Sequence, residues 1–250
     1  MSAQPKFKWV SSAATHVGHV RQINEDAYLE RDDLSLWAVA DGMGGHHAGD
    51  VASSKIVEIL DETESSTASN PLSAYVDAIE DKIISANTHL VNLAKEHKDN
   101  RTIGSTVVTM IATDDHCALL WAGDSRAYRC RDKETLQLTQ DHSQVEEMVQ
   151  QGLILPEEAE QHPASNVITR AVGASENIYV DVGIEQILPG DTFLLCSDGL
   201  NKHVSDAEIN DLLQLPDIED IPEKLVEMTL SRGAIDNVTV VVVRALENTE

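Results

Sequence analysis

The sequence predicts an α+β protein in which antiparallel β-sheets pack against long helices. Three short β-rich runs, at 105–112, 118–122 and 127–131, follow one another with connections too short for a parallel crossover, so we expect antiparallel neighbours. Apolar residues from 76 to 93 recur every three or four positions, which is typical of an amphipathic helix lying on a core. A doubly wound parallel sheet is therefore disfavoured.

Composition limits the classes of partner and compartment. The chain of 250 residues is long enough for a sizeable core, and its formal net charge of -25 argues against binding to nucleic acid or to an anionic membrane surface. No apolar run approaches the length of a membrane span or a signal peptide. Cys117, Cys130 and Cys196 have no C-x-x-C spacing, so they predict core thiols in a reducing compartment, the cytoplasm.

The segment 36–49 combines a buried strand with an acidic, glycine-rich turn. Residues 36–40 form a continuous apolar run, the pattern of a strand that is buried on both faces, and Asp41 follows directly. The glycines after it allow positive φ and close approach of other groups. Helical spacing then resumes at the apolar residues Val51, Ala52, Ile56 and Ile59.

An acidic residue at the end of an apolar run is a recurring pattern in this chain. The instances are Asp41 after 36–40, Asp124 after 118–122, Asp198 after 193–196, and Asp236 before 238–243. A single Asp-Gly pair is often only turn chemistry, but the repetition favours a cluster of carboxylates held by Mg²⁺ or Mn²⁺. The alternative is a set of unrelated carboxylates exposed to solvent.

A polar segment at 17–27 contains Arg21, followed by Asn24, Glu25 and Asp26. An arginine near two acids is commonly a surface ion pair. If the segment lies beside Asp41, the guanidinium becomes a forked donor for a phosphate instead. Spacing alone leaves both interpretations open.

The remaining segments complete the predicted order of elements. Residues 62–70 are polar and aperiodic, which indicates a loop. Residues 143–165 read as a short helix followed by a broken, exposed excursion, either a mobile flap or an ordinary surface loop. Two short helices at 208–215 and 222–230 precede a buried final strand at 238–245.

Several common catalytic motifs are missing from the sequence. There is no Walker loop, and the glycine-rich turn fails G-x-G-x-x-G because His47 stands at the third glycine position. There is also no H-E-x-x-H motif and no G-x-S-x-G elbow, so a zinc hydrolase or a serine hydrolase of those types is not indicated.

Short motifs occur in a distinctive order along the chain: Arg21-x-x-Asn24-Glu25-Asp26, Ala40-Asp41-Gly42-Met43-Gly44-Gly45, Gly104-Ser105-Thr106, Gly123-Asp124-Ser125-Arg126, Asp141-His142-Ser143, Ser197-Asp198-Gly199 and Asp236-Asn237-Val238-Thr239. Read together, they closely resemble the metal-dependent protein serine/threonine phosphatases of type 2C, most of all the short bacterial branch. The resemblance extends to about Arg244, and the stretch 36–53 is also similar to phosphatases associated with type VI secretion.

The resemblance implies a four-layer α-β-β-α sandwich with two divalent metals, Mn²⁺ or Mg²⁺, at one edge. It implies one catalytic domain over 1–250, with a flap at 143–165 and a short tail at 246–250. Carried over by position, Asp41 bridges both metals and the Gly42 carbonyl ligates one of them. Asp198 and Asp236 complete the coordination of the other.

Further roles follow from the same resemblance. Glu25 and Asp26 hold water molecules on the metals, and Asp124 serves a weaker third metal. Arg21 grips the substrate phosphate. The implied partners are phosphorylated protein substrates and a cognate bacterial serine/threonine kinase, and a monomer is expected.

The implied reaction is hydrolysis of phosphoserine or phosphothreonine by a water that bridges two metals. Many eukaryotic relatives have a histidine directly after the Asp-Gly pair, whereas this chain has Met43, so the general acid would be a metal-bound water or a nearby group such as His46. Two alternatives remain: a phosphopeptide-binding or regulatory module with little turnover, and hydrolysis of small phosphate esters.

Overall fold

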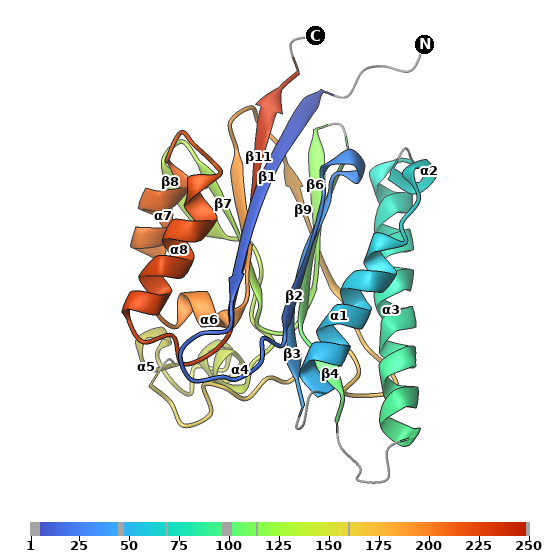
Figure 1. The fold of residues 1–250 in the computed structure, drawn as a ribbon, viewed down its shortest axis with the longest axis vertical. Helices are drawn as coiled ribbons and strands as arrows, with labels where there is room; N and C mark the ends of the chain where they lie inside the picture. The colour runs from blue at the N-terminus through green and yellow to red at the C-terminus, as the bar shows by residue number, and fades with distance from the viewer. Residues whose placement is uncertain are drawn as a thin grey trace.

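The computed structural model describes residues 6–44, 48–68, 70–96, 102–113, 115–159 and 161–248. Two antiparallel sheets face each other and helices cover both outer faces (Figure 1). One outer layer is formed by α1 (Ala48–Asp61) and α3 (Leu72–Glu96), and the other by α6 (Asp198–Asn201), α7 (Asp206–Leu213) and α8 (Asp220–Ser231). The predicted α-β-β-α sandwich is therefore confirmed.

The first sheet has the strand order β1-β11-β10-β7-β8. Its members are β1 (Phe7–His16), β7 (Arg126–Arg131), β8 (Glu134–Gln137), β10 (Thr192–Cys196) and β11 (Val238–Glu247). All of its pairings are antiparallel, and β1 pairs with β11 from Phe7↔Glu247 to His16↔Val238. The first and last strands of the described chain thus lie side by side (Figure 1).

The second sheet has the order β2-β3-β5-β6-β9, with a short strand, β4, that also pairs with β3. Its members are β2 (Asp26–Arg31), β3 (Leu36–Met43), β4 (Gly104–Ser105), β5 (Val107–Thr113), β6 (His116–Ala122) and β9 (Asp181–Gln186). A 3₁₀ turn, η1 (Asp32–Leu34), joins β2 to β3.

The position of β3 between two cores explains why residues 36–40 are all apolar. Leu36, Ala38 and Ala40 pack under α1 and α3, whereas Trp37 and Val39 pack against the other sheet. Alternate residues of a strand point to opposite faces, so a strand between two cores needs an apolar residue at every position. All five side chains are 0% exposed, which confirms the predicted strand buried on both faces.

Three local predictions were wrong. β6 and β7 are not neighbours in one sheet, because the turn at 123–125 carries the chain from one sheet to the other. The predicted loop at 62–70 contains a short helix, α2 (Ser65–Ala68). The strand expected at 36–40 continues to Met43, because Gly42 and Met43 pair with β4.

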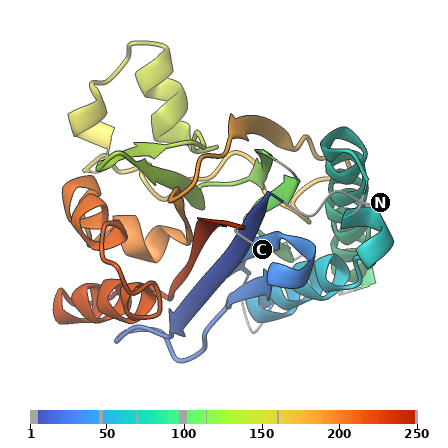
Figure 2. The ribbon, with the colours of Figure 1, turned by 90° about the horizontal axis from the view of Figure 1, so that it is seen from above.

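The excursion at 143–165 contains α4 (Gln144–Gln150) and α5 (Pro156–Ala159), which project from the side of the sandwich (Figure 2). Ser143 caps α4 by accepting a hydrogen bond from the Glu146 N–H. Nowhere in the described ranges is a helix both long enough and apolar enough to cross a bilayer.

Candidate metal centre

A cleft of about 400 Å³ opens where the end of β3, the turn after β6, the start of α6 and the start of β11 meet. Its lining includes most of the site residues expected from the sequence: Arg21, Glu25, Asp41, Gly42, Asp124, Asp198 and Asp236. Asp26 is not part of this lining, and His46 lies outside the described residues. Side chains far apart in the sequence therefore share one cleft.

The pairing of β2 with β3 brings the first two carboxylates together. Asp26 and Asp41 are directly opposite each other in this antiparallel pair, a relation that places side chains about 5 Å apart. The Asp41 N–H donates to Thr106 Oγ1 at 3.1 Å, and Ser105 Oγ donates to the Asp41 carbonyl at 2.9 Å. The Gly104-Ser105-Thr106 motif thus fixes the backbone of Asp41.

Gly42 is required because three segments meet at its Cα. A Cβ there would lie 2.0 Å from the Gly49 carbonyl oxygen and 2.5 Å from that of Glu25. The Gly42 N–H donates to the Glu25 carbonyl at 3.0 Å, and the Gly49 N–H donates to Glu25 Oε1 at 3.2 Å. The predicted close approach is confirmed, and it holds the Glu25 carboxylate beside the turn.

Asp198 and Asp236 enter the cleft from the other sheet. Asp198 is the first residue of α6, after β10, and Asp236 precedes β11. Arg21 pairs with Asp236, with Nε at 2.9 Å from Oδ1 and Nη2 at 3.0 Å from Oδ2. The structure therefore places Arg21 within the carboxylate cleft, paired with a distant acid rather than with its sequence neighbours.

Burial and repulsion from neighbouring carboxylates raise the pKa of Asp26, Asp41 and Asp124. The pKa of Asp41 is well above its usual value because burial disfavours the charged form, with Asp26, Asp198, Asp124 and Asp236 adding repulsion. Burial is also the main cause of the raised pKa of Asp26, and repulsion from Asp198 and Asp236 adds to it. Asp124 has a raised pKa for the same reasons. A bound divalent cation would remove this repulsion.

The donor set fits hard divalent cations. Asp26 Oδ1 and Asp198 Oδ1 are buried with no hydrogen-bond partner, although a buried carboxylate oxygen normally has one. Carboxylate and carbonyl oxygens are the ligands that Mg²⁺ and Mn²⁺ prefer. Across the described ranges, no three potential ligands already converge on one point. Instead, Arg21 and Lys202 supply positive charge to Asp236 and Asp198.

Two residues that shape this cleft were not assigned a role from the sequence. Asn237 accepts a hydrogen bond from the Glu25 N–H at 2.8 Å and donates to the carbonyls of Val17 and Ile23 at 2.9 and 3.0 Å. It was visible only as the residue after Asp236. Lys202 stands four positions after Asp198, a helical spacing that could have indicated their pairing.

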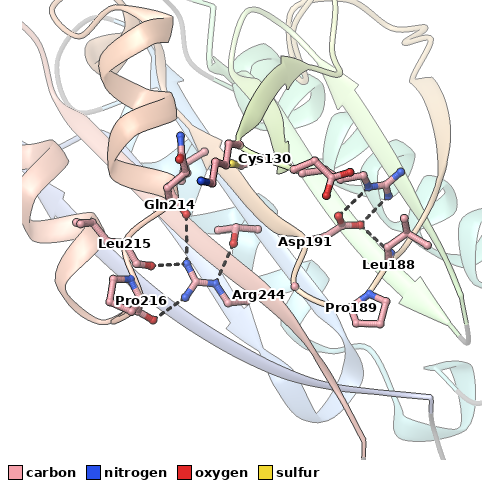
Figure 3. A pocket seen from close by; sticks show the side chains of 14 residues that line it. Cys130, Leu188, Pro189, Asp191, Gln214, Leu215, Pro216 and Arg244 are labelled. Carbon is pink, nitrogen blue, oxygen red and sulfur yellow. Dashed lines mark hydrogen bonds and ion pairs between the residues drawn. The ribbon is translucent and has the colours of Figure 1, made fainter.

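A second cavity, of about 440 Å³, lies at the opposite end of the first sheet (Figure 3). Two charged side chains in its lining, Arg244 and Asp191, already have hydrogen-bond or ion-pair partners. Arg244 donates to the carbonyls of Leu213, Leu215 and Pro216, and Asp191 pairs with Arg131 at 2.7 Å (Figure 3). These contacts tie the end of α7 and the 187–191 segment to the sheet, a structural role.

The sequence is similar to a known family of phosphatases. Residues 15–237 match the family profile described as protein phosphatase 2C. The serine/threonine protein phosphatase PstP of Mycobacterium tuberculosis is 36% identical over 231 residues, which are 92% of this chain and 44% of PstP. The chain thus spans less than half of that relative. The serine/threonine phosphatase Stp of Listeria welshimeri is 33% identical over 92% of this chain and 93% of Stp.

Solved structures give the same assignment. PppA of Pseudomonas aeruginosa, described as a key regulatory component of T6SS, has a TM-score of 0.86 and 41% identity, covering 95% of this chain and 98% of PppA. The catalytic domain of PstP in complex with two manganese ions has a TM-score of 0.83 and 32% identity, covering 96% of this chain and 100% of that one. The chain belongs to the protein phosphatase 2C family.

Proposed function

We propose that this chain hydrolyses phosphoserine and phosphothreonine in proteins at the carboxylate cleft, with two Mn²⁺ or Mg²⁺ ions as cofactors. The observation that carries the proposal is the convergence of Asp41, Asp198 and Asp236 with Arg21 in one cleft. Clustered carboxylates hold the cations, and a guanidinium beside them recognises the dianionic substrate.

The proposed ligands come from both sheets. Asp41 would contact both ions, the Gly42 carbonyl would hold one, and Asp198 with Asp236 would hold the other. When bound, two divalent ions neutralise the phosphoryl oxygens and make a water acidic enough to attack phosphorus. Asp124, at the turn between the sheets, is proposed to serve a weaker third ion.

The remaining residues orient water and substrate. Glu25 and Asp26 are proposed to accept hydrogen bonds from water at the site, and the free oxygen Asp26 Oδ1 supports such a role. Arg21 is proposed to present two N–H groups to the phosphate after leaving Asp236. Because the Arg21 side chain is 51% exposed, its ion pair with Asp236 is weak. Replacing Asp236 by the substrate phosphate therefore costs little free energy.

Mn²⁺-dependent phosphate release from a phosphothreonine peptide tests the proposal. Wild-type protein should release phosphate, and Asp41→Ala should abolish release because it removes the shared ligand. Binding of the peptide without turnover would support the alternative of a low-turnover phosphopeptide-binding module. Faster hydrolysis of small phosphate metabolites than of phosphopeptides would redirect the substrate assignment.

His46 is proposed as the general acid that protonates the leaving alkoxide. The support is chemical, because Met43 lines the cleft and cannot donate a proton, and His46 is three residues further along. His46→Ala should slow alkyl phosphates much more than p-nitrophenyl phosphate, whose leaving group needs no protonation. Equal slowing of both substrates would reject the assignment.

The biological setting is proposed from the relatives and the composition. We propose a monomeric catalytic domain, over 1–250, that opposes a bacterial serine/threonine kinase. Similarity to PppA favours a pathway linked to type VI secretion. The cytoplasm is the proposed compartment, since Cys117, Cys130 and Cys196 are free and buried. Comparing phosphoproteomes of cells with and without the chain would identify its substrates.

A further inference from the structure

We propose that Lys202 sets how tightly the Asp198 side of the metal centre binds a divalent cation, because its ammonium group competes with the cation for one carboxylate. This inference rests on the proposed metal-dependent function. It assigns to Lys202 a tuning role on cofactor affinity, separate from substrate binding and from the chemical step.

The geometry places Lys202 against Asp198. Lys202 follows the last residue of α6, one helical turn after Asp198, and Lys202 Nζ forms an ion pair with Asp198 Oδ2. The other carboxylate oxygen, Asp198 Oδ1, is buried and without a hydrogen-bond partner. One oxygen of this proposed ligand is therefore occupied by an ammonium group, while the other remains open to a cation.

The charges around Lys202 keep it in place. Besides Asp198, the carboxylates of Asp236 and Asp124 line the same cleft and attract the Lys202 ammonium group. Lys202 also lines the carboxylate cleft itself, so its positive charge lies where the cations would bind.

The Lys202 side chain is more deeply buried than that of Arg21, the other positively charged residue named in the cleft. The Lys202 and Asp198 side chains are 27% and 14% exposed, whereas Arg21 and Asp236 are 51% and 26% exposed. Solvent weakens the interaction of exposed pairs more than that of partly buried ones. The pair formed by Lys202 therefore opposes cation binding more strongly than the pair formed by Arg21.

Removing the ammonium should strengthen cation binding for two reasons. Asp198 no longer has to leave a partner, and a positive charge no longer repels the incoming ion. Allowing for screening at this partly exposed position, together these effects should tighten the Kd for Mn²⁺ by about fivefold to tenfold.

Calorimetric titration of the metal-stripped full chain with Mn²⁺ tests the inference. Lys202→Met should bind Mn²⁺ about fivefold to tenfold more tightly than wild type, whereas Lys202→Arg, which keeps the charge, should stay close to wild type. Lys224→Met is the matched control, because Lys224 forms the same i,i+4 pair with Asp220 on α8 but does not line the cleft. An unchanged or weaker affinity in Lys202→Met would overturn the inference.

A second measurement detects the change in affinity through thermal stability instead of the heat of binding. In chelator, Lys202→Met should have a lower Tm than wild type, because Asp198 has lost its counter-ion, and saturating Mn²⁺ should raise its Tm by more. An equal rise in the two proteins would count against the inference. If Lys202→Met does not fold, Lys202→Gln replaces it in both measurements. Absence of Mn²⁺ binding by wild type at millimolar metal would instead refute the proposed function.

Discussion

At the scale of single residues, His142 supports the cleft from behind through both ring nitrogens. Its Nδ1 accepts a hydrogen bond from the Gly123 N–H at 3.1 Å, so the proton resides on Nε2, which lies 3.2 Å from Asp181 Oδ2. The ring stacks on Trp121 with an interplanar angle of 7°. A neutral imidazole therefore holds the turn that carries Asp124.

We predict that the protein loses stability as His142 becomes protonated. Burial lowers the pKa of His142 below 6.5, with Arg170 adding to the effect, and the hydrogen bond to Asp181 and the charge of Asp141 oppose it only in part. A lowered folded-state pKa gives stability that is present above pH 6.5 and is lost as the pH falls through the folded-state pKa. Urea unfolding in chelator as a function of pH measures this.

His142→Asn is the variant for comparison. An asparagine side chain can still accept from the Gly123 N–H but does not titrate, so the stability of wild type should fall relative to that of His142→Asn between about pH 7 and about pH 5. Identical pH profiles for the two proteins would show that another group causes the loss.

Gly42 gives a second residue-scale prediction. Gly42→Ala should lower the free energy of unfolding by about 3 kcal/mol or more, because its Cβ would overlap the backbone of Gly49 and Glu25. Equilibrium unfolding in urea measures this change. Gly183→Ala is the matched control, since a Cβ there would make only an ordinary contact, at 3.7 Å, with Trp121. Equal stability of the two variants would show that Gly42 is not required by the close approach of Gly49 and Glu25.

At the scale of elements, the connection from β1 to β2 is fastened to the start of β11 by Asn237. We predict that Asn237→Ala raises the KM for a phosphopeptide more than it lowers kcat, because the connection carries Arg21. Loss of three hydrogen bonds should also cost about 3 kcal/mol of stability. Steady-state kinetics at saturating Mn²⁺ provides the KM and kcat values.

Asn210→Ala is the control, because Asn210 accepts a hydrogen bond from Thr135 at 3.0 Å outside the lining of the carboxylate cleft. It should leave KM unchanged. A fall in kcat alone for Asn237→Ala would indicate that Asn237 acts on the chemical step rather than on substrate binding.

Strong periodicity made some elements predictable, and tertiary context decided the others. The apolar residues of α3 repeat at helical spacing and the run in β3 is continuous, so both could be predicted. The edge strand β9 contains Gly183 and exposes Val182 and Ile184, a pattern too weak to indicate a strand. A short turn such as 123–125 fits either a hairpin or a change of sheet, and only the packing of two sheets selects the second.

At the scale of the whole molecule, the ends of apolar runs were informative because both sheets direct such ends toward the same cleft. That Asp41 and Asp198 come at the ends of apolar runs could be seen locally, but their meeting requires two sheets to stack. The spacing of the carboxylates did not show that they form one site. The resemblance of the ordered motifs to type 2C phosphatases did. The pairing of Arg21 with Asp236 depends on side-chain placement, which no motif specifies.

Net charge gives a prediction for the whole molecule. With a formal charge of -25, repulsion among surface carboxylates should destabilise the fold, and salt should screen it. Raising NaCl from about 50 mM to about 500 mM in chelator should therefore raise Tm by several degrees. Thermal unfolding followed by circular dichroism measures this, and a falling Tm would show that favourable ion pairs outweigh the repulsion.

The pairing of β1 with β11 also determines how the protein can be handled. Phe7 and Glu247 are opposite each other at the far end of these strands, whereas Asp236 lies just before the other end (Figure 1). An affinity handle or a fluorescent label attached at Phe7 or Glu247 would therefore lie away from the carboxylate cleft. Attachment to a bead through such a handle would leave the entrance facing bulk solvent, accessible to a large phosphorylated polypeptide.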